Sequence, residues 1–254
     1  MTGALTFAGG RVSLIHGDCR EVMKYIAPQS VDLVLTDLPY GTTYAKWDEV
    51  LPMGELWSLF DNLSKPKAAH VFTASQPFTS LLVNSRPEWF RTSWVWDKVH
   101  AANFANANRH PMKVHEDVLV FASGQTTYNP QKTPGRPNNS HGNTHTRKSD
   151  TMRIDRRGEF DGTGMKYPKS IQTFEKHTSS LGLHPTQKPV PLFEYFIRTY
   201  SDPGAMVLDP CAGSGTTAEA AMRTDRRAIC IEQDAHYFGI AAKRLQAVEE
   251  ELSQ

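Results

Sequence analysis

The sequence has few cysteines and no long apolar run. Its three cysteines are widely spaced and form no Cys-x-x-Cys pair, so neither a disulfide framework nor a cysteine zinc site is indicated. No segment approaches the run of about 18 apolar residues that marks a membrane-spanning helix, and no signal peptide is recognisable. We therefore expect a cytoplasmic protein without a membrane or metal partner.

Net charge is also nearly absent, with 28 basic against 27 acidic side chains. The overall charge therefore does not indicate a nucleic-acid binder, and any basic surface has to be local. The length of 254 residues favours one domain with an insertion, large enough for a substantial core.

Short β-rich runs alternate with helical periodicities on both sides of one irregular stretch. The expected strands are residues 11–16, 31–36, 68–74, 92–96, 118–122, 205–208 and 227–231. The expected helices are residues 19–26, 52–63, 77–84, 190–200, 216–223 and 235–252. This alternation predicts a layered α/β domain.

The irregular stretch covers residues 123–180, where Gly, Asn, Thr, Pro and His dominate and basic side chains outnumber acidic ones. A long loop of this kind is usually functional or disordered, and a solvated insert without function is the alternative. Its basic side chains suit DNA phosphates, and a polar loop at residues 100–110 carries base-reading chemistry. The candidate DNA contacts are Asn103, Arg109, Arg147, Lys148, Arg153, Arg156 and Arg157.

The strand at residues 31–36 ends in Asp37-Leu38-Pro39-Tyr40. Asp37 is an acceptor-only carboxylate when ionised. Pro39 favours an extended Leu38, whose carbonyl is then available as a second acceptor. Because two acceptors can take both hydrogens of an exocyclic amine while Tyr40 stacks on the ring, the group suits an aromatic amine. A β-turn with a structural aspartate is the alternative.

A second motif, DPCAGSGTTA, follows the strand at residues 205–208. Gly213, Gly215 and Ala218 match the G-x-G-x-x-G/A nucleotide loop, and Glu232 ends the next strand, where an acid binds ribose hydroxyls. A dinucleotide-binding enzyme and a plain turn are the alternatives. Asp209 argues against a pyrophosphate, which it would repel, and suits an amino or sulfonium cation.

The sequence resembles the DNA amino-methyltransferases, which transfer methyl from S-adenosylmethionine to adenine N6 or cytosine N4. TDLPYG resembles their catalytic motif, DPCAGSGTT their cofactor loop and HPTQKP the segment near the methionine end of the cofactor. SWVWDK and HEDVLVFA resemble intermediate strands, and the motif order is that of the β type. The resemblance covers residues 10–122 and 184–248. Leu38 departs from the proline that the family more often has.

The resemblance implies a doubly wound methyltransferase sheet of order 3-2-1-4-5-7-6. It divides the chain into a catalytic half (1–122), a target-recognition insertion (123–180) and a cofactor-binding half (181–254). It implies a catalytic group of Asp37, Leu38, Pro39 and Tyr40. The residues implied to bind S-adenosylmethionine are Asp18, Cys19, Asp37, His184, Thr186, Lys188, Asp209, Pro210, Ala212, Gly213, Ser214, Gly215, Thr216, Glu232 and Gln233.

Within this set, Asp18 is expected near the cofactor adenine, although a helix-capping role fits it equally well. Glu232 is expected on the ribose, and Thr186 and Lys188 near the methionine carboxylate.

The resemblance implies direct methyl transfer to double-stranded DNA after base flipping. Asp37 favours adenine N6 as the acceptor, with cytosine N4 as the alternative. An RNA methyltransferase and a non-catalytic DNA-binding module are less favoured. A bacterial or phage enzyme, monomeric or homodimeric and associated with the nucleoid through DNA, is expected. The recognition sequence and any restriction partner stay open.

Overall fold

A computed structural model describes residues 3–45, 48–102, 104–135, 164–175 and 187–254. The chain divides into two compact units. Unit 1 comprises Met1–Asn129 and Ser170–Gln254, and unit 2 is Pro130–Lys169.

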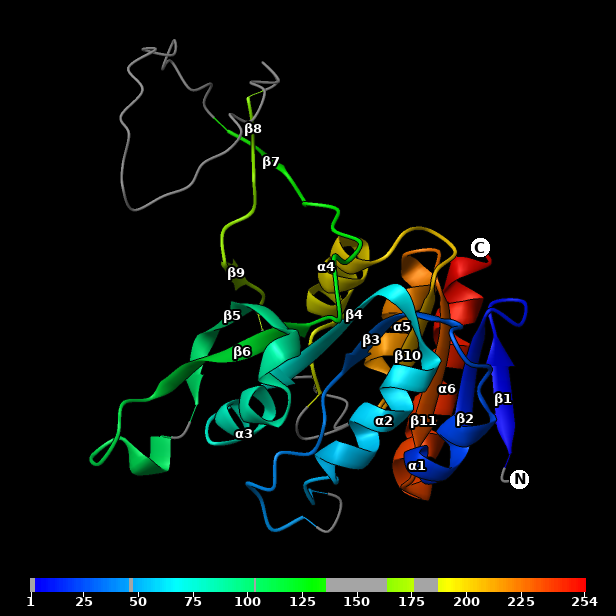
Figure 1. The fold of residues 1–254 in the computed structure, drawn as a ribbon, viewed down its shortest axis with the longest axis horizontal. Coiled ribbons are helices and arrows are strands. Elements are labelled where there is room, and N and C mark those ends of the chain that lie inside the picture. The colour runs from blue at the N-terminus through cyan, green and yellow to red at the C-terminus, as the bar shows by residue number, and fades with distance from the viewer. Residues whose placement is uncertain (1–2, 46–47, 103, 136–163, 176–186) are drawn as a thin grey trace. The chain divides into compact units, whose positions relative to one another are not determined.

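Unit 1 is built on a sheet that has nine strands among the described residues, in the order β1-β2-β11-β10-β3-β4-β6-β5-β9 (Figure 1). The strands are β1 Ala4–Phe7, β2 Val12–His16, β3 Val31–Thr36, β4 Ser64–Ala74, β5 Phe90–Ala102, β6 Lys113–Phe121, β9 Ile171–Thr173, β10 Met206–Asp209 and β11 Arg227–Glu232. The central strands from β2 to β4 run parallel, whereas β6 pairs antiparallel with both of its neighbours.

The helices of unit 1 lie on both faces of this sheet. They are α1 Cys19–Val22, α2 Met53–Leu63, α3 Phe78–Ser85, α4 Val190–Tyr200, α5 Thr216–Arg223 and α6 Ala235–Leu252, with short 3-10 turns at η1 Met23–Tyr25, η2 Pro87–Trp89 and η3 Phe104–Asn106. None of the described helices combines the length and apolar character needed to cross a membrane.

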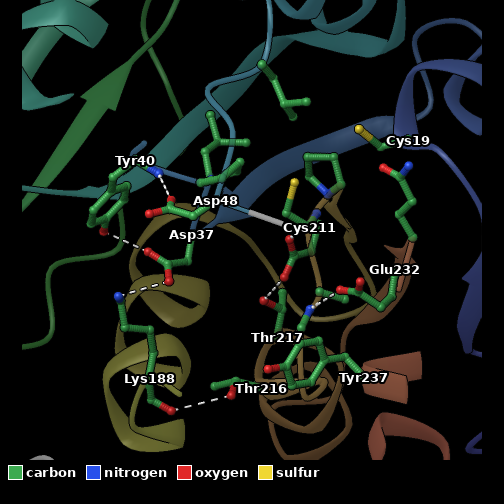
Figure 2. Close-up of a pocket in the computed structure, with 18 of the residues that line it drawn as sticks. Cys19, Asp37, Tyr40, Asp48, Lys188, Cys211, Thr216, Thr217, Glu232 and Tyr237 are labelled. Atoms are coloured by element: carbon green, nitrogen blue, oxygen red, sulfur yellow. Dashed lines mark hydrogen bonds and ion pairs between the residues drawn. The ribbon is translucent and has the colours of Figure 1, made fainter. Parts of the chain in front are cut away.

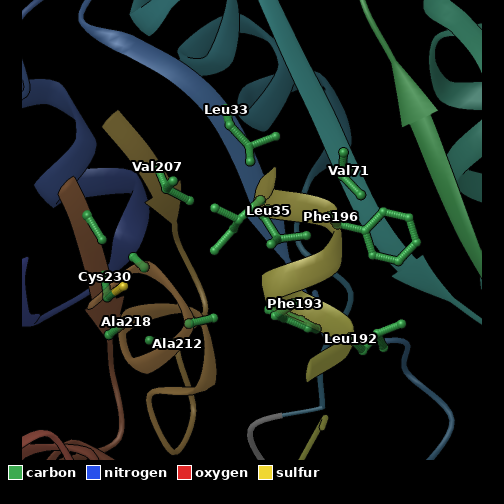
Figure 3. Packing of buried hydrophobic residues seen from close by; sticks show 14 of the residues in the cluster. Leu33, Leu35, Val71, Leu192, Phe193, Phe196, Val207, Ala212, Ala218 and Cys230 are labelled. Carbon is green, nitrogen blue, oxygen red and sulfur yellow. The ribbon is translucent and has the colours of Figure 1, made fainter. Parts of the chain in front are cut away.

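Strand β3 is buried on both faces, as the apolar run predicts. Leu33 and Leu35 belong to the core cluster that includes Phe193 and Phe196 of α4 (Figure 3). Val34 belongs to the second cluster, together with side chains of α1, α2 and α3. Because the strand is packed on both faces, the residue that follows its carboxyl end has a fixed position.

The sheet order implied by the family resemblance is confirmed, with β1 and β9 added at the two edges. The hairpin of β5 and β6 extends beyond the predicted apolar runs, since Asp97 pairs with His115 and Ala102 with Lys113. Backbone hydrogen bonds continue the strand pairing into segments with polar side chains. A prediction that relies on apolar periodicity therefore makes these strands too short.

Unit 2 contains a short antiparallel pair, β7 Thr133–Pro134 and β8 Met165–Lys166. The Lys132 ammonium lies 4.4 Å from the centroid of the Tyr167 ring. Part of the predicted insertion at residues 123–180 belongs to unit 1, because β9 pairs with β5. The candidate DNA contacts Arg147, Lys148, Arg153, Arg156 and Arg157 lie outside the described residues.

Candidate active site

The two predicted motifs lie at the ends of neighbouring strands. β10 pairs directly with β3, with Val207 opposite Leu33 and Leu208 opposite Val34. Both strands therefore end at the same sheet edge, where an α/β fold has its ligand crevice. Asp37 and Asp209 line one cavity of about 670 Å³ there (Figure 2).

The Asp37 carboxylate accepts hydrogen bonds from two hydroxyls and forms one ion pair. Its Oδ1 accepts from the Tyr40 hydroxyl at 2.7 Å and from the Thr73 hydroxyl of β4. Its Oδ2 lies 2.9 Å from Nζ of Lys188. Since each carboxylate oxygen has about two lone-pair sites, Oδ2 keeps one acceptor site for a further donor.

Tyr40 is held on one face by Phe78, with ring centroids 5.1 Å apart and planes at 18°. Burial raises the pKa of its phenol well above the ordinary value, and the charges of Asp37 and Glu116 raise it further. Tyr40 is therefore a neutral hydrogen-bond donor to Asp37 at any physiological pH.

Asp48 organises the loop that follows the tetrapeptide Asp37-Leu38-Pro39-Tyr40. Its Oδ1 accepts from the backbone N–H groups of Tyr40 and Gly41, at 2.7 and 2.9 Å. Its Oδ2 accepts from those of Thr42 and Thr43, at 2.9 and 2.7 Å. Gly41 has a φ of +67°, and a Cβ there would lie 2.8 Å from Val50 Cγ2, so this turn requires glycine.

Lys188 lies buried between two carboxylates. Its Nζ is 2.9 Å from Asp37 Oδ2 and 3.1 Å from Oε2 of Glu116 on β6. Burial alone would lower the pKa of Lys188, but the charges of the two acids outweigh it and raise the pKa. The resemblance implied a cofactor carboxylate as the partner of Lys188. In the structure its ammonium is engaged by two carboxylates of the chain itself.

The glycine loop is held by Asp209, which is buried at the end of β10. Its carboxylate accepts from the Cys211 N–H at 3.0 Å and from the Thr217 hydroxyl. Burial raises the pKa of Asp209 to about 6. Gly215, the N-cap residue just before α5, has a φ of +82°, and a Cβ there would lie 3.2 Å from that of Ala241.

Glu232, at the end of β11, has one backbone donor on each carboxylate oxygen. Oε2 accepts from Gly213 N and Oε1 from Asp234 N, both at 2.7 Å. Burial raises the pKa of Glu232, although these two hydrogen bonds act in the opposite direction. One acceptor site per oxygen stays available, which matches the two hydroxyls of a ribose.

Most of the predicted site residues meet in this cavity. Those that line it are Cys19, Asp37, Leu38, Pro39, Tyr40, Lys188, Asp209, Pro210, Ala212, Gly213, Ser214, Thr216, Glu232 and Gln233. Gly215 shapes the turn without being among the lining residues. His184 and Thr186 lie outside the described residues, as does Asn103.

Asp18 has the capping role that the sequence left open. Its Oδ1 accepts from the Arg20 N–H at 2.9 Å at the start of α1, and its Oδ2 pairs with the Arg20 guanidinium at 2.6 Å. The hydrogen bond from that guanidinium lowers the pKa of Asp18. Asp18 is not among the lining residues, whereas Cys19 and Arg20 are.

Sequence reasoning missed three residues that support Asp37 or its loop: Asp48, Thr73 and Glu116. Glu116 belongs to the motif HEDVLVFA, which gave the only available signal. Asp48 and Thr73 lie in segments without a motif. Arg109 is described in an exposed turn, where its N–H donates to Asn106 O at 2.9 Å. Within the described part of the chain, no group of His, Cys, Asp or Glu could hold a metal ion.

Residues 31–243, most of the chain and both motifs, match the family model for N6 and N4 methyltransferases, described as DNA methylase. The chain belongs to this DNA methylase family. The prediction of a DNA amino-methyltransferase with the methyltransferase fold is thereby confirmed, as is S-adenosylmethionine as the cofactor of the family.

Known relatives cover nearly the whole chain. The DNA adenine methyltransferase YhdJ of Escherichia coli K12 is 24% identical over 254 residues, covering 94% of this chain and 84% of the relative. The crystal structure of the M1.HpyAVI–SAM complex has a TM-score of 0.64 at 24% identity and covers 92% of this chain and 98% of that one. The cytosine-N4-specific PvuII DNA methyltransferase also has a TM-score of 0.64, at 15% identity, covering 99% of this chain and 93% of that one.

Proposed function

We propose that this DNA methyltransferase methylates N6 of adenine in double-stranded DNA, with the base rotated out of the duplex into the cavity. The observation that carries the proposal is the position of Asp37. Its carboxylate lies at the end of β3, in the same cavity as the glycine loop at the end of the adjacent strand β10. An amine held by Asp37 is therefore held beside the cofactor site. A base inside a duplex cannot reach such a crevice, so it has to flip.

The chemistry required of the protein is to make a delocalised amine nucleophilic. Bound S-adenosylmethionine supplies an electrophilic methyl group on a sulfonium. The free acceptor site on Asp37 Oδ2 and the carbonyl of Leu38 can accept the two amine hydrogens, which localises the nitrogen lone pair toward the methyl group. As the N–C bond forms, the bond between the methyl carbon and the sulfonium sulfur breaks with its electron pair left on sulfur, and Asp37 is the group placed to take the proton that the amine releases. Proximity supplies much of the rate.

The cofactor-side residues fit a nucleoside bearing a cation. Glu232 offers one acceptor site on each oxygen for a pair of vicinal hydroxyls. Asp209, with its pKa near 6, is largely ionised at neutral pH and favours a positive charge nearby. A pyrophosphate would meet both carboxylates, so this site favours S-adenosylmethionine over NAD.

Adenine is preferred to cytosine for two reasons. The charged Asp37 is a stronger acceptor than the hydroxyl that stands at this position in enzymes favouring cytosine. The relative YhdJ is named as a DNA adenine methyltransferase. The likeness to the cytosine-N4-specific PvuII enzyme keeps N4 methylation of cytosine as the alternative.

The basic residues of the insertion are proposed to contact DNA phosphates, together with Arg109. Replacing Arg153, Arg156 and Arg157 by Ala should flatten the salt dependence of DNA binding, because fewer counterions are released. An unchanged salt slope would place the phosphate contacts elsewhere.

The deciding experiment is methyl transfer from labelled S-adenosylmethionine to DNA, followed by nucleoside analysis. We expect N6-methyladenine, and we expect Asp37→Ala to abolish transfer while calorimetry shows the cofactor still bound. N4-methylcytosine alone would reverse the choice of base. DNA binding without transfer would favour a non-catalytic module, and transfer to RNA alone would remove DNA as the substrate.

A further inference from the structure

Four buried or half-buried charges form one row at the catalytic aspartate. Asp37 pairs with Lys188 at 2.9 Å, and Lys188 pairs with Glu116 at 3.1 Å. Glu116 Oε1 lies 3.1 Å from Nζ of Lys98 on β5. Both lysines are only 6 to 7% exposed. Burying charged groups in this way is costly, and an apolar replacement is often at least as stable, so a row of this kind is poorly explained by stability alone.

We propose that Lys188 is a positioning residue for methyl transfer, which keeps the Asp37 carboxylate ionised and oriented for the target amine, and that Glu116 holds Lys188 in this place. The inference rests on the proposed function, since it concerns the same reaction. It assigns Lys188 to the catalytic acid and not to a cofactor carboxylate.

The hydrogen bonds around Asp37 show how the orientation is set. The hydroxyls of Tyr40 and Thr73 both donate to Oδ1. Lys188 pairs with the other oxygen, Oδ2, and Figure 2 shows Tyr40 and Lys188 on separate oxygens of Asp37. With both oxygens engaged, the carboxyl group cannot rotate freely. The acceptor site left on Oδ2 therefore has a defined direction.

The backbone of Lys188 is hydrogen-bonded to the cofactor side of the cavity. Its carbonyl accepts from the Thr216 hydroxyl at 3.4 Å, and Thr216 begins α5 directly after the glycine loop. Pro189 follows and precedes α4. The residue that neutralises Asp37 is thus attached to the helix that begins at the cofactor loop.

Other titratable groups lie near Asp37 or near its ion-pair partners. These groups are Tyr40, Lys98, Glu116, Lys188 and Asp209. The pKa values of Tyr40 and Lys188 are raised and that of Glu116 is lowered, so these three keep their charge state around neutral pH. Asp209 has a pKa of about 6, so its titration would also change the pH dependence of activity. The titration of Asp37 therefore has to be measured on its own carboxyl group.

The test titrates the Asp37 carboxyl by ¹³C NMR in cofactor-free protein, with the signal assigned by its loss in Asp37→Asn. Lys188→Met should raise the midpoint by about one pH unit or more, because Asp37 loses a cation within hydrogen-bond distance. Glu116→Gln should lower it if the amide oxygen still holds Lys188, because a neighbouring negative charge disappears, and should raise it if Lys188 is released. Lys98→Met is the matched control, since it removes a buried cation from the same Glu116 without touching Asp37. It should give less than half of the Lys188→Met shift.

The rate of methyl transfer, measured on the same variants, should be affected more by Lys188→Met than by Lys98→Met. In Lys188→Met, kcat should fall and its acid limb should move to higher pH, with KM for DNA nearly unchanged, and Lys188→Arg should recover most of the loss. Equal shifts in the two Met variants, or no shift in Lys188→Met, would each overturn the proposal, and an unchanged midpoint in Glu116→Gln would overturn the role of Glu116. A lower KM for DNA with unchanged kcat in Lys188→Met would also overturn the proposal, because Lys188 would then only occupy the place of the amine.

Two features keep the test decisive. If Lys188→Met does not fold, Lys188→Gln replaces it, because it also removes the cation, and an unchanged Asp37 midpoint in that variant would overturn the proposal. If the wild-type protein transfers no methyl group to DNA, the proposed function fails, whereas the titration order still reports on Lys188.

Discussion

Replacing Asp48 by Ala should disorder the loop at residues 40–43 while leaving the rest of the fold intact. Four backbone N–H groups, those of residues 40 to 43, lose a charged acceptor. Hydrogen bonds to charged groups contribute about 1.5–3 kcal/mol each when buried. Gly41, Thr42 and Thr43 are exposed and regain water, so only the Tyr40 N–H stays poorly solvated. We therefore expect a net loss of roughly 2–4 kcal/mol in loop order.

This loss should appear in catalysis more than in stability. A difference of 2–4 kcal/mol lowers the equilibrium constant for ordering the loop by about 30- to 1,000-fold, and kcat should fall by up to that factor. The dissociation constant for S-adenosylmethionine should change by no more than about threefold, because the hydrogen bonds of Glu232 and Asp209 do not involve Asp48.

The assay is steady-state methyl transfer to DNA, with calorimetry for cofactor binding and thermal unfolding for global stability. Asp48→Asn is the matched control. Its amide oxygen can accept from two of the N–H groups while its NH₂ faces the other two, so it should lie between wild type and Asp48→Ala. A kcat for Asp48→Ala within threefold of wild type would refute the role given to Asp48.

The role of Asp48 should not depend on pH in the usual assay range. Burial alone would raise its pKa, but hydrogen bonds from Thr43, Gly41 and Tyr40 lower it below its ordinary value. Because the pKa is depressed in the folded state, the stabilisation is present above about pH 4 and is lost only as the pH falls further.

Three further predictions concern the cofactor side. Glu232→Ala should weaken S-adenosylmethionine binding by about 10- to 150-fold in calorimetry, since the ribose loses a charged acceptor; unchanged affinity would exclude the ribose role. The pKa of Asp209 is raised to about 6, so cofactor affinity should fall as the pH drops through 6 and the carboxylate is neutralised, and this dependence should disappear in Asp209→Asn. Gly215→Ala should destabilise the fold by about 1–3 kcal/mol in chemical denaturation, because of its positive φ and the nearby Ala241. Gly239→Ala, inside α6 with open space around it, should instead stabilise by up to about 1 kcal/mol, and equal effects of the two substitutions would contradict this reasoning.

The sequence by itself determined the strands, most helices and the two motifs. Apolar residues at strand or helix spacing are local signals, and residues 190–200, 216–223 and 235–252 are helical as predicted. The glycine positions also have a local cause. Gly213 and Gly215 both adopt a positive φ, which glycine tolerates best. The motif order indicated the family and, through it, the order of the sheet.

Only the tertiary structure decided which side chains support Asp37. Thr73, Glu116 and Lys188 are 36, 79 and 151 positions from Asp37 along the chain, and no periodicity connects them to it. They meet because β4 pairs with β3, β6 pairs with β4, and α4 packs on the same sheet. Asp18 is a second example. Its position before a helix suited a ligand role and a capping role equally, and only the structure distinguished them. Hydrogen-bond partners are set by packing across the fold, and a linear sequence does not record which of two nearby donors a carboxylate will bind.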